Sequence, residues 1–247
     1  MKTMLITGGS RGIGAATAVL AAENGYAVAI NYNKNKDAAD AIVAAITAKG
    51  GKAVAIQADI SIEADVLRLF EETDKQLGDL YCLVNNAGIL EKQMRVEDIT
   101  AERLNRIFAA NITGQFICAR EAIKRMSTKH GGRGGTIINV SSIAARLGSP
   151  DEYVDYAASK GAIDTFTIGL SKEVAAEGIR VNAVRPGLIY TDIHADGGEP
   201  GRVDRVKASL PMKRGGQPAE IAEAIIWLAS EKSSYATGSF IDLGGGR

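Results

Sequence analysis

Residues 4–14 read Met-Leu-Ile-Thr-Gly-Gly-Ser-Arg-Gly-Ile-Gly and join a short apolar run to an alanine-rich segment. Met4–Thr7 is predicted to be a strand, and Gly12–Asn24 has the spacing of a helix that ends at Gly25. A strand that passes through a glycine-rich turn directly into a helix is typical of the first unit of an alternating α/β fold.

The same alternation continues to the end of the chain. Further apolar runs predict strands at Ala27–Asn31, Ala53–Gln57, Tyr81–Val84, Thr136–Val140, Arg180–Val184 and Ser239–Leu243. Helical stretches between them lie at Asp37–Lys49, Glu63–Leu77, Ala101–Met126, Tyr153–Glu177 and Pro218–Ser230. Because the strands are continuously apolar, both faces of the sheet are expected to be covered. The predicted fold class is α/β: one doubly wound domain over residues 1–247, with a parallel sheet of about seven strands and helices on both faces.

Composition narrows the class of protein. The 247 residues are 46% hydrophobic and 23% charged, and the formal net charge is +0, so no overall field attracts nucleic acid or an anionic membrane. The N-terminus runs into a strand without a signal-peptide pattern, and no apolar stretch approaches the length of a membrane span. Cys82 and Cys118 are expected to be buried, reduced thiols, and the scattered histidines give no metal-ligand pattern. We expect a cytoplasmic protein that binds no metal, nucleic acid or membrane.

The glycines of the first turn suit a phosphate group. A pyrophosphate needs close approach of the backbone, free N–H groups and the positive end of a helix dipole. Gly8, Gly12 and Gly14 allow this because they have no β-carbon. A glycine triplet alone fits any tight strand–helix turn, but at the first crossover of an alternating fold it predicts a dinucleotide site.

The end of the second strand is expected to decide which dinucleotide binds. A carboxylate there holds a ribose 2′-hydroxyl and repels a 2′-phosphate. The strand at 27–31 is followed at 32–36 by Tyr-Asn-Lys-Asn-Lys, which contains no acid. Arg11, Asn33 and Lys34 are therefore predicted to favour NADP(H) over NAD(H), unless they are solvated loop side chains.

A tyrosine–lysine pair is the main candidate for chemistry. Tyr156 and Lys160 are four residues apart, which places them on one face of the helix predicted at 153–177. A tyrosine has a pKa of about 10, and a nearby ammonium group lowers this pKa by favouring the phenolate. Such a phenol is able to act as general acid towards a carbonyl or general base towards an alcohol. Tyr153 is a weaker alternative because no lysine follows it at that spacing.

Other polar residues occupy positions that call for a role. Ser141-Ser142 follows the strand at 136–140, where a hydroxyl is able to bond a substrate oxygen or to cap a turn. Residues 85–88, Asn-Asn-Ala-Gly, follow the strand at 81–84. Asn111 interrupts an apolar helix face, so it is expected either to brace the backbone or to bind a water molecule.

Together these residues resemble the short-chain dehydrogenase/reductase family along essentially the whole chain. The motifs that carry the resemblance are Thr7-Gly8-x-x-x-Gly12-x-Gly14, Asp59, Asn85-Asn86-Ala87-Gly88, Asn111, Ser142, Tyr156-x-x-x-Lys160 and Pro186-Gly187-x-x-x-Thr191. Each motif is weak alone, but all of them in order at the family's spacing form a specific signal. Ser142 stands one residue further from Tyr156 than is common in the family, which leaves Ser141 as an alternative hydroxyl.

The resemblance implies a Rossmann-type fold and hydride transfer between a nicotinamide dinucleotide and a small carbonyl or alcohol. It implies that Tyr156 protonates the carbonyl oxygen, which Ser142 orients. Lys160 would hold the nicotinamide ribose and lower the tyrosine pKa, and Asn111 would fix a water molecule on the proton path.

The resemblance also assigns residues to the dinucleotide. They are Gly8, Ser10, Arg11, Gly12, Ile13, Gly14, Tyr32, Asn33, Lys34, Asp59, Ile60, Asn86, Ala87, Gly88, Tyr156, Lys160, Pro186, Gly187, Ile189 and Thr191. Asp59 and Ile60 would frame the adenine. Residues 86–88 would contact the adjoining ribose, and residues 186–191 would seat the nicotinamide and its phosphate.

Three loops are expected to select the substrate: residues 91–96, 144–153 and 188–213, the last being a long irregular stretch that would form a lid. These loops contain the polar side chains Arg95, Arg146, Tyr153, His194, Arg202 and Arg205. Such side chains suggest a polar or anionic substrate, or else they are simply solvated. The resemblance extends to a bacterial subgroup of glucose 1-dehydrogenase-like and 3-oxoacyl-[acyl-carrier-protein] reductase-like proteins. An acidic carrier protein needs a basic surface, for which the candidates are Lys124, Arg125, Lys129 and Lys172.

Three functions are therefore compared. The first is a general carbonyl reductase or alcohol dehydrogenase, and the second is a 3-oxoacyl-[acyl-carrier-protein] reductase. The third, of another class, is a non-catalytic NADP(H)-binding sensor or scaffold, against which the joint presence of Ser142, Tyr156 and Lys160 argues. The resemblance further implies a homotetramer, assembled through the helices at 101–126 and 153–177 and the C-terminal segment.

Overall fold

The computed structural model describes all residues, 1–247, and contains one seven-stranded sheet. The strands are β1 (Lys2–Ile6), β2 (Tyr26–Tyr32), β3 (Lys52–Gln57), β4 (Leu80–Asn85), β5 (Gly135–Val140), β6 (Ile179–Pro186) and β7 (Phe240–Leu243). Their order in the sheet is β3-β2-β1-β4-β5-β6-β7, and every neighbouring pair is parallel. The predicted fold class is confirmed.

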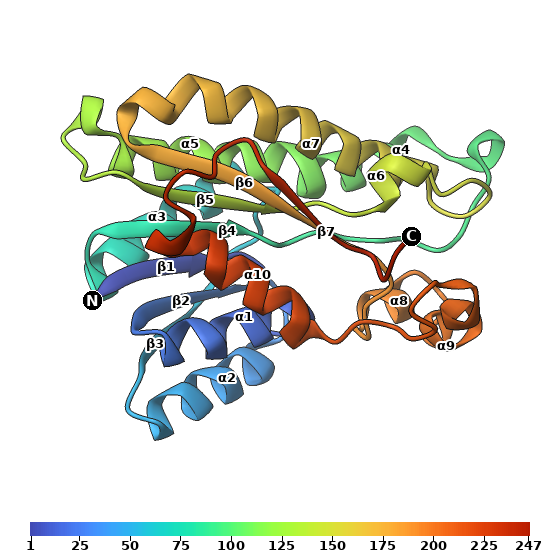
Figure 1. Ribbon diagram of the computed structural model, residues 1–247, viewed down its shortest axis with the longest axis horizontal. Helices are drawn as coiled ribbons and strands as arrows, with labels where there is room; N and C mark the ends of the chain where they lie inside the picture. Colours follow the sequence, from blue (N-terminus) through green and yellow to red (C-terminus); the bar gives the residue numbers. More distant parts are fainter.

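Helices cover both faces of the sheet (Figure 1). One face carries α1 (Gly12–Glu23), α2 (Lys36–Ala48) and α10 (Pro218–Ala229), and the other carries α3 (Glu63–Leu77), α5 (Gly114–Met126) and α7 (Val154–Val174). Met4 and Ile6 belong to the buried cluster on the first face and Leu5 to that on the second. This split follows from the strand geometry, because successive side chains point to opposite faces.

Two predicted helices differ in detail from the observed ones. The stretch predicted as one helix at 101–126 consists of α4 (Ala101–Phe108), a π-helical turn (Ala109–Thr113) and α5. The stretch at 153–177 is α7 followed by a 3₁₀ turn (Ala175–Glu177). The π-turn contains Asn111, and such insertions occur often at functional sites because they redirect one side chain.

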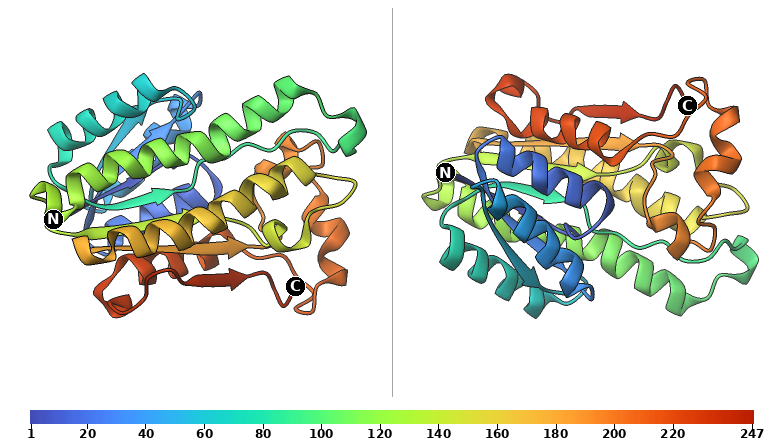
Figure 2. Two further views of the ribbon diagram at one scale, coloured as in Figure 1. Left: turned by 90° about the horizontal axis from the view of Figure 1, so that it is seen from above. Right: turned by 90° about the horizontal axis from the view of Figure 1, so that it is seen from below.

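The segment predicted as a long irregular lid is partly helical. It contains α8 (Ile193–Asp196), α9 (Arg202–Val206) and a 3₁₀ turn (Lys207–Ser209). These short helices lie beyond the carboxyl ends of the strands, beside α6 (Ala144–Leu147) and the start of α7 (Figure 2). Their shortness explains why periodicity did not reveal them, since one turn gives no repeating pattern.

The topology fixes where a ligand is able to bind. β1 lies between β2 and β4, so the chain reverses its direction of winding at the β1–β4 boundary. Open parallel sheets bind ligands in the crevice outside the carboxyl ends of the strands at such a point. The loops after β1, β4, β5 and β6, which carry the predicted motifs, all open at this edge.

The two cysteines have the burial that the sequence predicts. Cys82 and Cys118 are buried and unpaired, as predicted. No helix combines the length and apolar character needed to cross a membrane.

A buried ion pair joins α4 to the start of α7. Arg103 Nε lies 2.6 Å from Asp155 Oδ2, and the two side chains are 5% and 1% exposed. Arg103 also donates to the Lys92 carbonyl oxygen, and Asp155 accepts from the Tyr156 backbone N–H. The pair therefore holds the helical turn from which the Tyr156 side chain projects.

Asp155→Ala is expected to lower the free energy of unfolding by about 3 kcal/mol, because it leaves Arg103 charged and unpaired in the interior. Urea denaturation measures this loss. The double variant Arg103→Met/Asp155→Ala is expected to lose less, since no buried charge remains. A double variant as unstable as the single one would contradict the explanation.

Candidate active site

One large cleft, of about 1030 Å³, opens at the carboxyl edge of the sheet. All the residues predicted for catalysis or dinucleotide binding line it, except Gly14 and Asn111. Residues far apart in the sequence, such as Gly12, Ser142 and Ile189, thus share one cavity. The sequence prediction that these motifs meet is supported by their placement.

The glycine turn has the backbone geometry that its sequence suggests. Gly8 and Gly12 have φ angles of +62° and +52°, a region that favours glycine. A β-carbon on Gly14 would overlap the Gly8 carbonyl oxygen and lie 2.7 Å from Asn86 Nδ2. Gly14 therefore shapes the turn from behind and does not line the cleft.

The electrostatic environment of the turn also suits a phosphate group. α1 begins at Gly12 with no side-chain cap and no acidic residue in its first turn. The N–H groups at that end are not satisfied within a helix and carry the positive end of the helix dipole. The residues present thus suit the pyrophosphate of a dinucleotide.

The adenosine end of the cleft holds pairings that sequence reasoning missed. Asn33 Nδ2 donates to Asp59 Oδ2 at 2.9 Å. Burial by itself would raise the pKa of Asp59, but hydrogen bonds from Ser61 and Asn33 outweigh it, so the pKa lies below its ordinary value. Arg11 pairs across the cleft with Asp196 of α8, and both side chains are about half exposed. No sequence signal indicated either partner, because both lie far away along the chain.

Ser142, Tyr156 and Lys160 lie together at the other end of the cleft. Lys160 Nζ donates to the Val140 carbonyl oxygen at 2.8 Å and lies 5.6 Å from the centroid of the Tyr156 ring. The Ser142 side chain lies near enough to the Tyr156 phenol to lower its pKa, and its hydroxyl oxygen accepts from the Ala144 N–H at 3.1 Å. Ser141 instead donates to Asp164 Oδ1 at 2.7 Å. The structure thus distinguishes the two serines: Ser142 is the one beside the phenol.

The pKa values in this group are set by burial. Burial raises the pKa of Tyr156 to about 12, against smaller opposite effects of Ser142 and Arg202. Burial lowers the pKa of Lys160 to about 8. Lys160 is not among the groups that shift the Tyr156 pKa here, because its ammonium group is directed to the Val140 carbonyl, and its effect on the phenol stays a prediction. At neutral pH the phenol keeps its proton.

Asn111 braces the backbone, which is the first of the two alternatives considered for it. Its Nδ2 donates to the Ile89 carbonyl oxygen at 3.0 Å and to Ser159 Oγ at 3.2 Å, and its Oδ1 accepts from the Ile89 N–H at 2.7 Å. The side chain is fully buried and does not line the cleft. Asn111 therefore fixes the chain just after Gly88.

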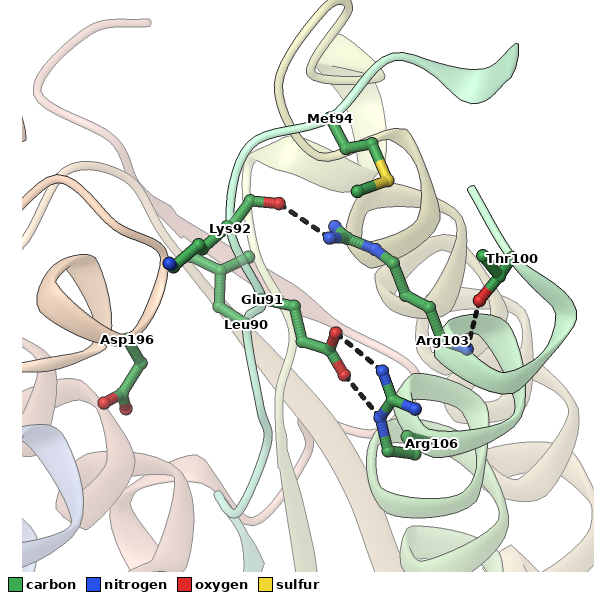
Figure 3. Close-up of a pocket in the computed structure, with 8 residues that line it drawn as sticks. All are labelled: Leu90, Glu91, Lys92, Met94, Thr100, Arg103, Arg106 and Asp196. Atoms are coloured by element: carbon green, nitrogen blue, oxygen red, sulfur yellow. Dashed lines mark hydrogen bonds and ion pairs between the residues drawn. The ribbon is translucent and has the colours of Figure 1, made fainter. Parts of the chain in front are cut away.

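The substrate loops are only partly as predicted. Residues 91–96 do not reach the large cleft; Glu91, Lys92 and Met94 line a separate hollow of about 410 Å³ (Figure 3). Arg95 and Arg146 also lie outside the cleft, where they pair with surface carboxylates. Each of these two arginines is thus paired with a nearby carboxylate. The sequence shows only that they lie in loops and does not show these pairs.

Two other side chains near the substrate end form hydrogen bonds within the protein, and two further residues line the cleft there. The Tyr153 hydroxyl donates to the Gly197 carbonyl oxygen at 3.0 Å, so this tyrosine is not a free alternative to Tyr156. His194, expected at the substrate or exposed on the lid, is buried, and its Nε2 bonds the Ile189 carbonyl oxygen. The cleft is also lined by Glu152 and Arg247, which sequence reasoning had not singled out.

Comparison with known proteins agrees with this geometry. The family model described as "Enoyl-(Acyl carrier protein) reductase" matches residues 8–247. The chain belongs to the short-chain dehydrogenase/reductase family. It is 63% identical over 247 residues, the whole of both chains, to an Escherichia coli protein named uncharacterized oxidoreductase YgfF. It is 37% identical over 245 residues, 99% of this chain and 97% of the other, to the 3-oxoacyl-[acyl-carrier-protein] reductase FabG of Staphylococcus aureus.

Solved structures of this family share the fold. A short-chain dehydrogenase/reductase from Serratia marcescens has a TM-score of 0.91 and 33% identity, covering 99% of this chain and 97% of that chain. A short-chain dehydrogenase from Burkholderia cenocepacia in complex with NADP has a TM-score of 0.90 and 32% identity with the same coverage. Membership of this family establishes the chain as an oxidoreductase.

Gly14→Ala is expected to raise the dissociation constant of the nicotinamide dinucleotide by about tenfold, because the added β-carbon forces the tight turn to shift. Isothermal titration calorimetry measures the constant. Gly169→Ala is the matched control, since a β-carbon at Gly169 meets open space. Equal affinities for the two variants would contradict the role assigned to Gly14.

Proposed function

We propose that the protein is an NADP(H)-dependent oxidoreductase that interconverts a small carbonyl compound and its alcohol, with Tyr156 as general acid and base. The observation that carries the proposal is the shared cleft. Ser142, Tyr156 and Lys160 line the same cavity as the glycine turn. A substrate oxygen beside the phenol is thus within the reach of a dinucleotide bound at that turn.

The residues divide the reaction between them. When bound, the nicotinamide supplies the hydride to the carbonyl carbon or accepts it from the alcohol carbon. In reduction the Tyr156 hydroxyl donates its proton to the carbonyl oxygen, and Ser142 holds that oxygen by a second hydrogen bond. In oxidation the tyrosine oxygen accepts the proton of the alcohol. A phenol with a pKa of about 12 is protonated at neutral pH, as a general acid for carbonyl reduction has to be.

Lys160 acts on the charge that the proton transfer leaves behind. With a pKa of about 8, it is roughly nine tenths protonated at pH 7. Its positive charge stabilises the phenolate formed when Tyr156 gives up its proton. Asn111 acts indirectly, because it holds the Ile89 backbone beside this group.

Three side chains support a preference for NADP(H). The end of β2 presents Asn33 and Lys34 and no carboxylate of its own. The exposed Arg11–Asp196 ion pair contributes at most about 1 kcal/mol of stability. A 2′-phosphate is therefore able to replace Asp196 as the partner of the Arg11 guanidinium. Asp59 acts in the opposite sense, since its carboxylate holds Asn33. The Burkholderia relative in complex with NADP supports the same preference.

A 3-oxoacyl-[acyl-carrier-protein] reductase is the second candidate, favoured by the names of relatives at 37% identity. The surface that would receive an acidic carrier protein argues against it. Lys124 pairs with Glu121, and Arg125 pairs with Asp74 and Glu121. This leaves Lys129 and Lys172 as the remaining basic side chains of that surface. A non-catalytic sensor ranks third, since it would not need the grouping of Ser142, Tyr156 and Lys160.

We also propose a cytoplasmic homotetramer assembled through α5 and α7, which lie side by side on one face of the sheet (Figure 2). Phe116 of α5 stacks on Phe166 of α7 with ring centroids 3.8 Å apart. Phe116 is 45% exposed, and Ile168 is 42% exposed. An apolar surface of this kind on paired helices suits contact with a second copy.

Tyr156→Phe is expected to reduce kcat for carbonyl reduction by at least about a hundredfold, because no other acid replaces the phenol. Loss of NADPH absorbance is followed with diketones, keto esters, acetoacetyl thioesters and sugars, and polyols are tested in the reverse direction. The dissociation constant of NADPH serves as control and should stay within about twofold of that of the wild type. Full activity without the phenol would refute the mechanism, and acetoacetyl-carrier substrates faster than all small carbonyls would favour the second candidate.

Arg11→Ala is expected to weaken NADPH binding by about tenfold and to change NADH binding little, because only the first carries a 2′-phosphate. Dissociation constants for both dinucleotides, measured by fluorescence titration, test this. Wild-type protein that binds NADH more tightly than NADPH would overturn the cofactor preference.

A further inference from the structure

Four charged side chains form a cluster at the substrate end of the cleft. Glu152 precedes α7, and Glu199, Arg202 and Arg205 belong to the lid. Arg202 pairs with one carboxylate oxygen of Glu152, and Arg205 Nη2 lies 3.4 Å from the other. Arg205 also pairs with Glu199. We call these four residues the roof cluster.

The roof cluster has no net charge. Two guanidinium groups face two carboxylates, and Glu152 is shared between both arginines. Arg202 is the more enclosed arginine, since its side chain is 13% exposed and its guanidinium lies 4.8 Å from the centroid of the Tyr153 ring. Glu152, Arg202 and Arg205 all line the cleft. The arginines that suggested an anionic substrate are thus already neutralised.

Arg202 also lies close enough to the reacting group to act on it. Its positive charge is one of the influences that lower the pKa of the Tyr156 phenol against burial. A substrate whose carbonyl reaches Tyr156 shares the cleft with Arg202 and Glu152. A second polar group on that substrate is therefore able to reach the roof cluster.

We propose that Glu152 is a specificity-determining residue that restricts the cleft to uncharged carbonyl compounds and excludes carboxylates. The inference rests on the function proposed above and names its substrate class. A carboxylate entering here has to displace Glu152 from Arg202 or lie beside a like charge. Both cost free energy that an ester, ketone or hydroxyl group does not incur.

The backbone around Glu152 is held independently of its side chain. Its carbonyl oxygen accepts from the Met94 N–H at 3.0 Å, and the next residue, Tyr153, donates through its hydroxyl to Gly197. Replacing the carboxylate by an amide of the same shape therefore leaves the loop attached to the lid. Glu152→Gln removes one negative charge and exposes the charge of Arg202, whereas Arg205 keeps Glu199.

The test compares matched substrates with and without a carboxylate. kcat/KM with NADPH is measured for ethyl acetoacetate against acetoacetate, and for 2,3-butanedione against pyruvate. The wild type is expected to prefer the uncharged member of each pair by at least about tenfold, and Glu152→Gln to reduce that preference by about tenfold through the KM of the anion. In the double variant Glu152→Gln/Arg202→Gln the preference should return towards the wild-type value, because the freed charge is gone.

The control is Glu97→Gln, which alters another Arg-paired glutamate outside the cleft and should leave the preference unchanged. Thermal unfolding midpoints verify that each variant folds. A wild type that prefers the anions, or an unchanged preference in Glu152→Gln, overturns the inference, and so does a double variant that keeps the altered preference. Absence of reduction with every carbonyl tested would instead reject the proposed function itself.

Discussion

The parallel pairing of seven strands, of which the inner ones are buried on both faces, is the constraint on which the rest of the molecule depends. It leaves the strand interiors apolar, so polar groups with chemical roles are confined to the loops at the strand ends. Because all strands point the same way, their carboxyl ends meet at one edge. The glycine turn after β1 and Ser142 after β5 are neighbours for this reason.

Burial controls the chemistry that this edge is able to perform. Tyr156 and Lys160 project from α7 into the cleft, and burial pushes each towards its neutral form. The phenol is therefore protonated at neutral pH, whereas the pKa of Lys160 is only about one unit above neutral. The buried pair of Arg103 and Asp155 fixes the helical turn beneath them, so the geometry does not depend on exposed contacts.

Charges at the two ends of the cleft are arranged differently. At the adenosine end, Arg11 takes part in an exposed pair that an incoming phosphate is able to replace. At the substrate end, Arg202 is enclosed and paired with Glu152, and that pairing is costly to break. We propose that the same residue type binds an anion at one end and discourages one at the other, according to its burial and its partner.

The sequence by itself determined the fold class, the family and the main motifs that meet in the cleft. These depend on local patterns: apolar strands of a certain length, glycines that permit close backbone approach, and a tyrosine and lysine one helical turn apart. The tertiary structure alone decided which of Ser141 and Ser142 faces Tyr156, that Asn111 braces Ile89, and that Asp59, Asp196 and Glu152 hold Asn33, Arg11 and Arg202. Such pairings join loops far apart along the chain, and the energy of a charge depends on its partner and its burial, neither of which is written in the local sequence.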